Sequence, residues 1–134
     1  MAINPVSKAQ PMREGEIAAI DALNAAVGKI NGFNKTLWTG NWSSGDITVS
    51  GLSDYSLFAV SLSDESAICL VYSPPNSSTF IGGTFDINTT PNVFALACRA
   101  LRSGNKLTYR NAGYINVAGT SIISRSITKI VGII

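Results

Sequence analysis

The sequence contains no histidine, and only 13% of its 134 residues are charged. Without histidine the chain cannot form a Ser-His-Asp or Cys-His catalytic arrangement, and it lacks the commonest zinc ligand. Ten basic and eight acidic residues leave a formal net charge of only +2. The basic residues are too dispersed to form a stripe that follows a phosphate backbone. We therefore expect no metal site, no cofactor and no binding of nucleic acid.

Cysteine and long apolar runs are also scarce. The two cysteines, Cys69 and Cys98, lie in apolar segments, where a free thiol behaves as a small buried hydrophobe. A disulfide between adjacent strands stays open as an alternative. No run approaches the ~20 apolar residues of a membrane span, and the N-terminus has no apolar signal-peptide core. We expect a chain that is made in the cytoplasm without export and is not inserted into a membrane.

The carboxylates do not predict an active site. Those beyond the N-terminal third of the chain are Asp46, Asp54, Asp64, Glu65 and Asp86. Two of them could in principle cleave a glycosidic bond, but a strand end, a turn or an outward strand position explains each one. Gly82-Gly83 lacks the Lys-Ser/Thr of a phosphate-binding loop, so a bulge or close backbone contact explains it better. We predict no catalytic residue and expect a protein that is not an enzyme.

The residues that are present divide the chain into three segments. Residues 1–12 contain two prolines and no periodicity, which predicts an extended arm. Residues 13–32 are rich in Ala, Glu and Leu and end in Asn-Gly, which predicts a helical stem. Residues 33–134 change to a period of two, which predicts a β-sandwich head domain.

The predicted stem carries four apolar residues at the 3-4-3 spacing of a coiled-coil seam, namely Ile20, Leu23, Val27 and Ile30. About two heptads form only a marginal coiled coil by themselves, so the head would have to associate as well. An amphipathic helix that lies against its own head also explains the spacing. We favour a stem that self-associates along this seam.

Beyond Phe33, short apolar segments alternate with Gly, Asn, Ser, Asp or Pro, which is typical of antiparallel sheets. This rhythm predicts a mainly β fold, an antiparallel, jelly-roll-like β-sandwich with one short N-terminal α-helix. The expected strands are 36–42, 46–52, 55–62, 67–72, 80–87, 93–101, 106–110, 114–117 and 126–131. Several are apolar on both faces, which indicates central strands whose second face a neighbouring subunit covers.

Two further features bear on binding. Trp38 and Trp42 are four residues apart on one predicted strand, and could stack on a sugar. We favour a place in the core or in a subunit interface for this pair. The loop from Ser73 to Ser78 contains two prolines and should be an exposed connection.

The run TLWTGNWSSGDITVSGLSDYSLFAVSL, from Thr36 to Leu62, resembles a signature of distal domains in bacteriophage tail fibres and related virion appendages. In that signature, Leu-Trp-x-Gly precedes a Gly-Asp/Thr-Ile-Thr-Val/Leu strand and then an apolar strand with Tyr or Phe. The C-terminal ITKIVGII resembles the Lys-Ile-x-Gly-Ile ending of those chains. The resemblance implies a homotrimeric β-sandwich head, a helical neck and a virion role in host attachment.

From this resemblance we expect a virion protein, made in the host cytoplasm without a signal peptide, that binds a host-surface receptor without catalysis. A saccharide is the expected receptor, and residues 1–12 would dock onto other virion proteins. The receptor-binding residues are unknown from the sequence, although distal loops such as 73–78 are candidates. A capsid or tail decoration protein that stabilises the particle is the alternative, and a glycan depolymerase is a third hypothesis.

Overall fold

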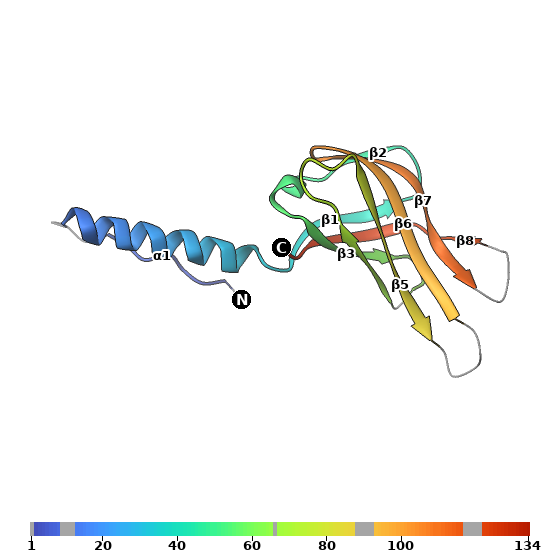
Figure 1. Cartoon of the computed structure of the whole chain (residues 1–134), viewed down its shortest axis with the longest axis horizontal. Coiled ribbons are helices and arrows are strands. Elements are labelled where there is room, and N and C mark those ends of the chain that lie inside the picture. The colour runs from blue at the N-terminus through green and yellow to red at the C-terminus, as the bar shows by residue number, and fades with distance from the viewer. Residues whose placement is uncertain (1, 9–12, 66, 88–92, 117–121) are drawn as a thin grey trace.

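A computed structural model describes residues 2–8, 13–65, 67–87, 93–116 and 122–134, and Figure 1 shows a helix that leads away from a β-rich head. The helix is α1 (Glu14–Gly32). The head contains β1 (Lys35–Trp42), β2 (Asp46–Thr48), the 3-10 helix η1 (Leu52–Asp54), β3 (Leu57–Leu62), β4 (Ile68–Tyr72), β5 (Thr79–Ile87), β6 (Val93–Ser103), β7 (Lys106–Asn116), β8 (Ile122–Ser124) and β9 (Ile127–Gly132). The mainly β, antiparallel class with one N-terminal helix is therefore confirmed.

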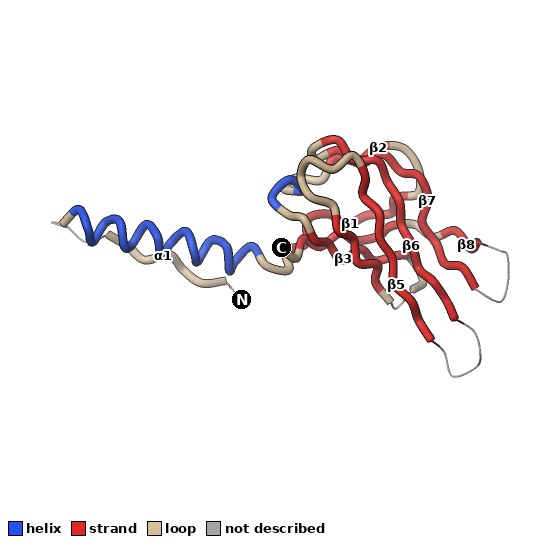
Figure 2. The backbone as a smooth tube through the Cα atoms, in the orientation of Figure 1, coloured by secondary structure: helices blue, strands red, loops and turns tan. Residues whose placement is uncertain are grey.

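The described strands all belong to one antiparallel sheet. Its order is β1-β9-β3-β4-β5-β6-β7-β2, and β8 pairs with β7. β1 and β2 lie at opposite ends of this order, yet only residues 43–45 separate them in the chain. The sheet must therefore curl until its two edges approach each other, as Figure 2 shows. One curled sheet thus surrounds the core, where the sequence predicted the layers of a sandwich.

Gly82 and Gly83 in β5 allow the strands beside them to come unusually close. A Cβ atom on Gly82 would lie 2.0 Å from the backbone oxygen of Leu70 in β4. One on Gly83 would lie 2.4 Å from the backbone oxygen of Leu96 in β6. Only residues without a side chain fit between these backbones. The close backbone contact predicted for this pair is confirmed.

The core fills the inside of the curled sheet. Its largest fully buried side chains are Phe58, Phe80, Leu52, Leu107, Ile127 and Ile130. Trp42 of β1 is also buried, and its ring meets Tyr109 of β7 edge-on with centroids 5.4 Å apart. Trp38 packs against this core with its centroid 6.3 Å from that of Trp42. The tryptophan pair therefore belongs to the core, as favoured above, and does not form an open sugar platform.

Cys69 and Cys98 are free and buried, which confirms the prediction of core thiols. Cys69 lies in β4 and Cys98 in β6, and their side chains hydrogen-bond to each other. The hydrogen bond to Cys69, together with burial, raises the pKa of Cys98. The same hydrogen bond lowers the pKa of Cys69, so Cys98 is the thiol of the pair that holds its proton more strongly.

β7 joins two strands that the sequence predicted separately, 106–110 and 114–117. The apparent turn between them contains Gly113, but this residue continues the strand. A Cβ atom there would lie 2.2 Å from the backbone oxygen of Ile123 in β8, a strand that the sequence did not predict. Val117 lies outside the described residues. Gly113 therefore allows β7 and β8 to approach each other closely and does not form a turn.

The predicted strand 46–52 is shorter than expected, since β2 ends at Thr48. Gly51 adopts a φ of +79°, in the left-handed region that favours glycine, and begins η1. Val49 and Leu52 are still fully buried. Buried apolar residues thus continue along the sequence beyond the last residue of β2.

The outer face of the sheet is apolar over β4 and β5. Ile68, Leu70 and Tyr72 of β4 are 44%, 51% and 71% exposed, and Ile81 of β5 is similarly open. Leu70 pairs with Gly83, so β4 and β5 continue one another on this face. No described part of the chain covers these side chains. The expectation that a neighbouring subunit covers them stays a prediction.

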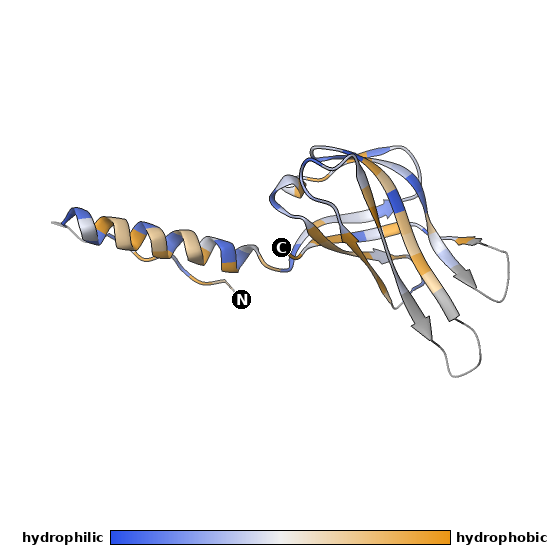
Figure 3. Cartoon of the chain, viewed as in Figure 1, coloured by the Kyte–Doolittle hydropathy of each residue, from blue (hydrophilic) through white to orange (hydrophobic). Residues whose placement is uncertain are grey.

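The stem projects from the head. Arg13 caps α1, and its backbone N–H donates to the Glu16 carboxylate over 3.3 Å, which is half of a capping box. Among the described residues, α1 makes no substantial contact with any strand, and Figure 3 shows both its polar and its apolar residues along the projecting helix. The Tyr55 hydroxyl donates to the carbonyl of Gly32 at the junction. The alternative in which the helix lies against its own head is therefore wrong.

No helix in the described ranges is long and apolar enough to cross a membrane.

Candidate functional site

The strand directions define two ends of the head. Lys35 at the start of β1 pairs with Gly132 near the C-terminus, whereas Trp42 at its end pairs with Ile127. β1 therefore leads from the stem end to the opposite, distal end. A cavity of about 320 Å³ lies at the distal end and is lined by polar side chains. We call it the distal pocket, whose lining includes Ser43, Asp64, Arg110, Asn111, Ser124 and Arg125.

An irregularity in β7 turns two successive side chains towards the distal pocket. Arg99 of β6 pairs with Asn111, and Ala100 pairs with Tyr109, so Arg110 is the extra residue of a β-bulge. A bulge interrupts the strict alternation of a strand and can re-aim side chains. Arg110 and Asn111 are both exposed as a result. Within the described part of the chain, neither side chain forms a hydrogen bond or an ion pair.

Another wall of the distal pocket is held in place by ionic and aromatic contacts. The Nε of Arg125 donates to a Glu65 carboxylate oxygen over 3.0 Å. The guanidinium of Arg125 also lies over the Tyr114 ring, 5.4 Å from its centroid. Tyr109 donates its hydroxyl to the backbone oxygen of Arg125 over 3.3 Å, and burial raises the pKa of this tyrosine. The pocket thus combines a fixed wall with the unpaired polar groups of Arg110 and Asn111.

These groups are suited to binding rather than to covalent chemistry. A guanidinium, an amide and serine hydroxyls offer several donors and acceptors to the hydroxyls of a ligand. Such convergent polar groups in a pocket determine the orientation and specificity of small ligands. Among the residues that the structure describes, no three His, Cys, Asp or Glu side chains come together as metal ligands.

The structure also separates the carboxylates that the sequence offered for glycosidic cleavage. Asp46 and Glu65 each form an ion pair with a basic side chain. Asp54 lines a cavity at the stem end of the head, whereas Asp64 lines the distal pocket. The side chain of Asp86 lies outside the described residues. Asp64 and Glu65 are neighbours in the chain, but of these two only Asp64 lines the distal pocket.

The loop from Ser73 to Ser78 lies at the stem end and not at the distal end, where the receptor hypothesis expected it. The backbone N–H of Ser73 donates to the oxygen of Ser56 over 2.7 Å. Ser56 in turn donates to the backbone oxygen of the C-terminal Ile134 over 2.6 Å. Pro75, Asn76 and Ser78 are exposed, as the sequence predicted for this loop, whereas Ser73 is fully buried.

Arg102 explains the burial of Ser73. Its side chain is only 4% exposed and donates to the backbone oxygens of Ser73, Pro74, Leu52 and Gly104. Burial lowers the pKa of this arginine, while the carbonyl oxygens compensate its charge locally. Sequence analysis missed this role, although the alternation of β6 places the residue in phase with the buried side of the strand. Arg102 therefore connects the loops at the stem end.

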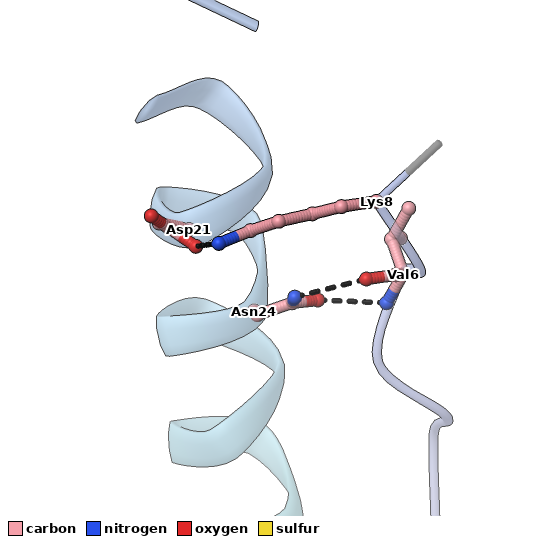
Figure 4. A network of polar contacts seen from close by, with 4 residues as sticks. All are labelled: Val6, Lys8, Asp21 and Asn24. Atoms are coloured by element: carbon pink, nitrogen blue, oxygen red, sulfur yellow. Dashed lines mark hydrogen bonds and ion pairs between the residues drawn. The ribbon is translucent and has the colours of Figure 1, made fainter. Parts of the chain in front are cut away.

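The stem binds the extended arm, residues 2–8, through two asparagine side chains. The Asn24 amide accepts a hydrogen bond from the Val6 N–H over 2.7 Å and donates one to the Val6 carbonyl over 3.1 Å (Figure 4). Asn31 binds the N–H and carbonyl of Ile3 in the same way, with both distances 2.9 Å. We call this pair of contacts the asparagine ladder. The arm runs antiparallel to α1, because the earlier arm residue meets the later asparagine.

The arm splits the predicted seam between two faces of α1. Val27 lies on the ladder face between the two asparagines and is 7% exposed, and Ile20 is partly buried. Because α1 does not pack on the strands, the arm is the element that covers Val27. Leu23 and Ile30, in contrast, are 49% and 51% exposed. Each directly precedes a ladder asparagine, so both lie about 100° around the helix from the arm.

A second cavity, of about 790 Å³, lies where the stem meets the head. Phe33, Tyr55 and Ile134 contribute apolar surface to it, and Lys29 and Lys35 line it as well. Ile30 is exposed but does not belong to the lining of this cavity.

Comparison of the chain with protein-family models, with characterised proteins and with solved structures gave no match in any of the three.

Proposed function

We propose that this chain is a non-catalytic phage virion protein that binds a host-surface saccharide through the distal pocket. The virion part of the proposal depends on the resemblance of Thr36–Leu62 and of the C-terminal ITKIVGII to phage fibre domains. The binding part depends on one observation: at the end opposite the stem, the bulge at Arg110 exposes two polar side chains that have no partner among the described residues. An attachment protein needs this separation, because one end joins the particle and the other meets the host.

A saccharide suits the distal pocket because its hydroxyl groups both donate and accept hydrogen bonds. Arg110 offers a forked set of donors, and Asn111 offers two donors and an acceptor. The fixed Arg125–Glu65 pair beside them loses little conformational entropy when a ligand arrives. The volume of about 320 Å³ is at the lower end of the range for small-molecule sites.

The proposal includes a homotrimer that other virion proteins hold through the stem and arm. Leu23 and Ile30 form an open apolar stripe on α1, and Ala19 and Ala26 are at compatible heptad positions. The apolar outer face over β4 and β5 supplies a second surface for neighbouring copies. Association through both surfaces compensates for a stem of only about two heptads.

The proposed function is tested by binding of the purified full chain to an array of bacterial surface glycans. We expect binding by the natural sequence and a loss of about tenfold or more in affinity for R110A/N111A, because two polar anchors of the pocket are removed. The variant K129A is the matched control, since Lys129 is an exposed basic residue of β9 that does not line the pocket. Binding that R110A/N111A leaves unchanged would place the receptor site elsewhere.

A decoration protein that stabilises the particle is the second candidate function. The exposed side chains of Ile68, Leu70 and Tyr72 favour it, because a broad apolar sheet face suits contact with another protein. No binding on the glycan array, together with normal adsorption of particles that lack the gene, would support decoration over receptor binding. The separated carboxylates of the described residues give no support to a glycan depolymerase.

A further inference from the structure

The asparagine ladder recognises the backbone of an extended segment. Each asparagine amide binds the N–H and the carbonyl of one and the same arm residue. This two-point contact reproduces the pairing that a neighbouring β-strand would offer. Val27 lies between the two asparagines and is covered by the arm. On the ladder face, the arm therefore meets an apolar side chain as well as the two polar amides.

The spacing of the rungs matches an extended chain. Asn24 and Asn31 are seven residues apart, which corresponds to about 10.5 Å along an α-helix. Val6 and Ile3 are three residues apart, which corresponds to about 9 to 10 Å in an extended chain. The two asparagines are therefore separated along the helix by about the same distance as the two arm residues that they bind. An ion pair between Lys8 and Asp21, 2.9 Å long, determines the direction of the arm (Figure 4).

We infer that the ladder face of α1 binds the N-terminal arm of a second copy of the chain, so that copies in the assembled oligomer exchange arms. The inference rests on the self-association in the proposed function and goes beyond it by naming the segment that joins the copies. Every contact described above can form between chains as well as within one, because the second copy supplies an identical arm. The charges of Lys8 and Asp21 are complementary in both arrangements.

Two features favour exchange over an arm that stays on its own helix. The apolar side chains of Ile3 and Val6 are about as exposed as those of Leu23 and Ile30 beside them. A neighbouring helix that covers this stripe comes close enough to receive the arm. Only residues 9–12 separate the described arm from Arg13 in the sequence, and a short connecting sequence favours exchange of segments between copies.

A charge-exchange experiment tests the inference on the full chain. K8E places a carboxylate opposite Asp21, and D21K places an ammonium group opposite Lys8, so each variant alone has only like-charged arm contacts. When the two variants are mixed, exchange brings the arm of each onto the helix of the other, and both arm contacts then join opposite charges, one in the natural sense and one reversed. Arms that remain on their own helix stay mismatched whatever the mixture. Both positions are largely solvent-exposed, so the fold should be unaffected, which circular dichroism verifies.

Native mass spectrometry of the mixture, with one variant isotope-labelled, measures the fraction of mixed oligomers. We expect about a twofold or greater excess over the statistical fraction at low salt, and a smaller excess at high salt, because the ion pairs are exposed. Labelled and unlabelled natural chains are the matched control and should mix statistically. A statistical mixture of K8E and D21K would overturn arm exchange while leaving self-association intact. A natural chain that is monomeric throughout would overturn both.

The ladder itself is tested by N24A/N31A, with N76A as the control because Asn76 is an exposed loop residue of the head. We expect the dissociation constant of the natural oligomer to rise about tenfold in N24A/N31A and to stay unchanged in N76A. An unchanged dissociation constant in N24A/N31A would show that the arms do not join the copies, and would overturn the inference.

Discussion

At the scale of single residues, Arg102 is the most constrained polar side chain of the head. It is buried without a carboxylate partner among the described residues, and backbone oxygens from separate loops receive its donors. Its guanidinium also lies over the Phe58 ring, 5.8 Å from the centroid. A buried cation of this kind is tolerated only because its donors are satisfied. The residue therefore stabilises the stem end of the sheet, where it connects separate loops.

Replacement of this arginine should destabilise the whole head. We expect R102A to lower the free energy of unfolding by about 3 kcal/mol, because several carbonyl oxygens lose their donors and a cavity remains. R99A, on the exposed side of the same strand, should change it by less than about 0.5 kcal/mol. Urea denaturation followed by tryptophan fluorescence measures both values. Equal stabilities of the two variants would contradict the structural role of Arg102.

Single residues also show how far the sequence could predict the candidate site. Burial of Cys69 and Cys98 followed from their apolar neighbours, since side-chain hydrophobicity is a local property. Alternation along the strand places Arg110 on the solvated face, but the exposure of its neighbour Asn111 did not follow, because a bulge depends on how β6 and β7 pair. The distal pocket also combines residues from several turns. The set of residues that lines the distal pocket could therefore not be predicted from local sequence patterns.

At the scale of elements, the helix and most strands were predictable because their periods are local. The way in which the strands join was not, since the order of the sheet depends on long-range pairing. The arm was predicted as extended, but its binding to α1 was not. Asn24 gave a usable signal, because asparagine has a low helix propensity in the middle of a helix, whereas Asn31 was explained by its place at the helix end.

Replacement of glycine by alanine should have opposite effects on stability in β5 and in α1. G82A should lower the free energy of unfolding by about 3 kcal/mol, because its methyl group would lie 2.0 Å from the backbone oxygen of Leu70 and would force β4 away. G28A should stabilise α1 by about 0.5 to 1 kcal/mol, because no atom lies within 4 Å of a Cβ there. Circular dichroism during denaturation measures both. Tolerance of G82A would mean that β4 and β5 are less close than described.

At the scale of the whole molecule, apolar surface remains uncovered in two places, the stripe on α1 and the outer face of β4 and β5. A chain with only 13% charged residues has few charges with which to keep such surfaces apart in solution. Self-association is therefore the simplest way for the molecule to cover them. The same surfaces leave the distal pocket open, because it lies at the other end of the head.

The proposed trimer is tested by placing a charge on the open stripe of the stem. We expect the natural chain to sediment as a trimer at micromolar concentration and L23D to sediment mainly as a monomer, because burial of an unpaired carboxylate is strongly unfavourable. A18D is the matched control: it introduces the same charge about 140° away around the same helix. Circular dichroism should show α1 intact in both variants, since both positions are exposed. A natural chain that sediments as a monomer, or an L23D oligomer as stable as that of A18D, would show that Leu23 does not join the copies.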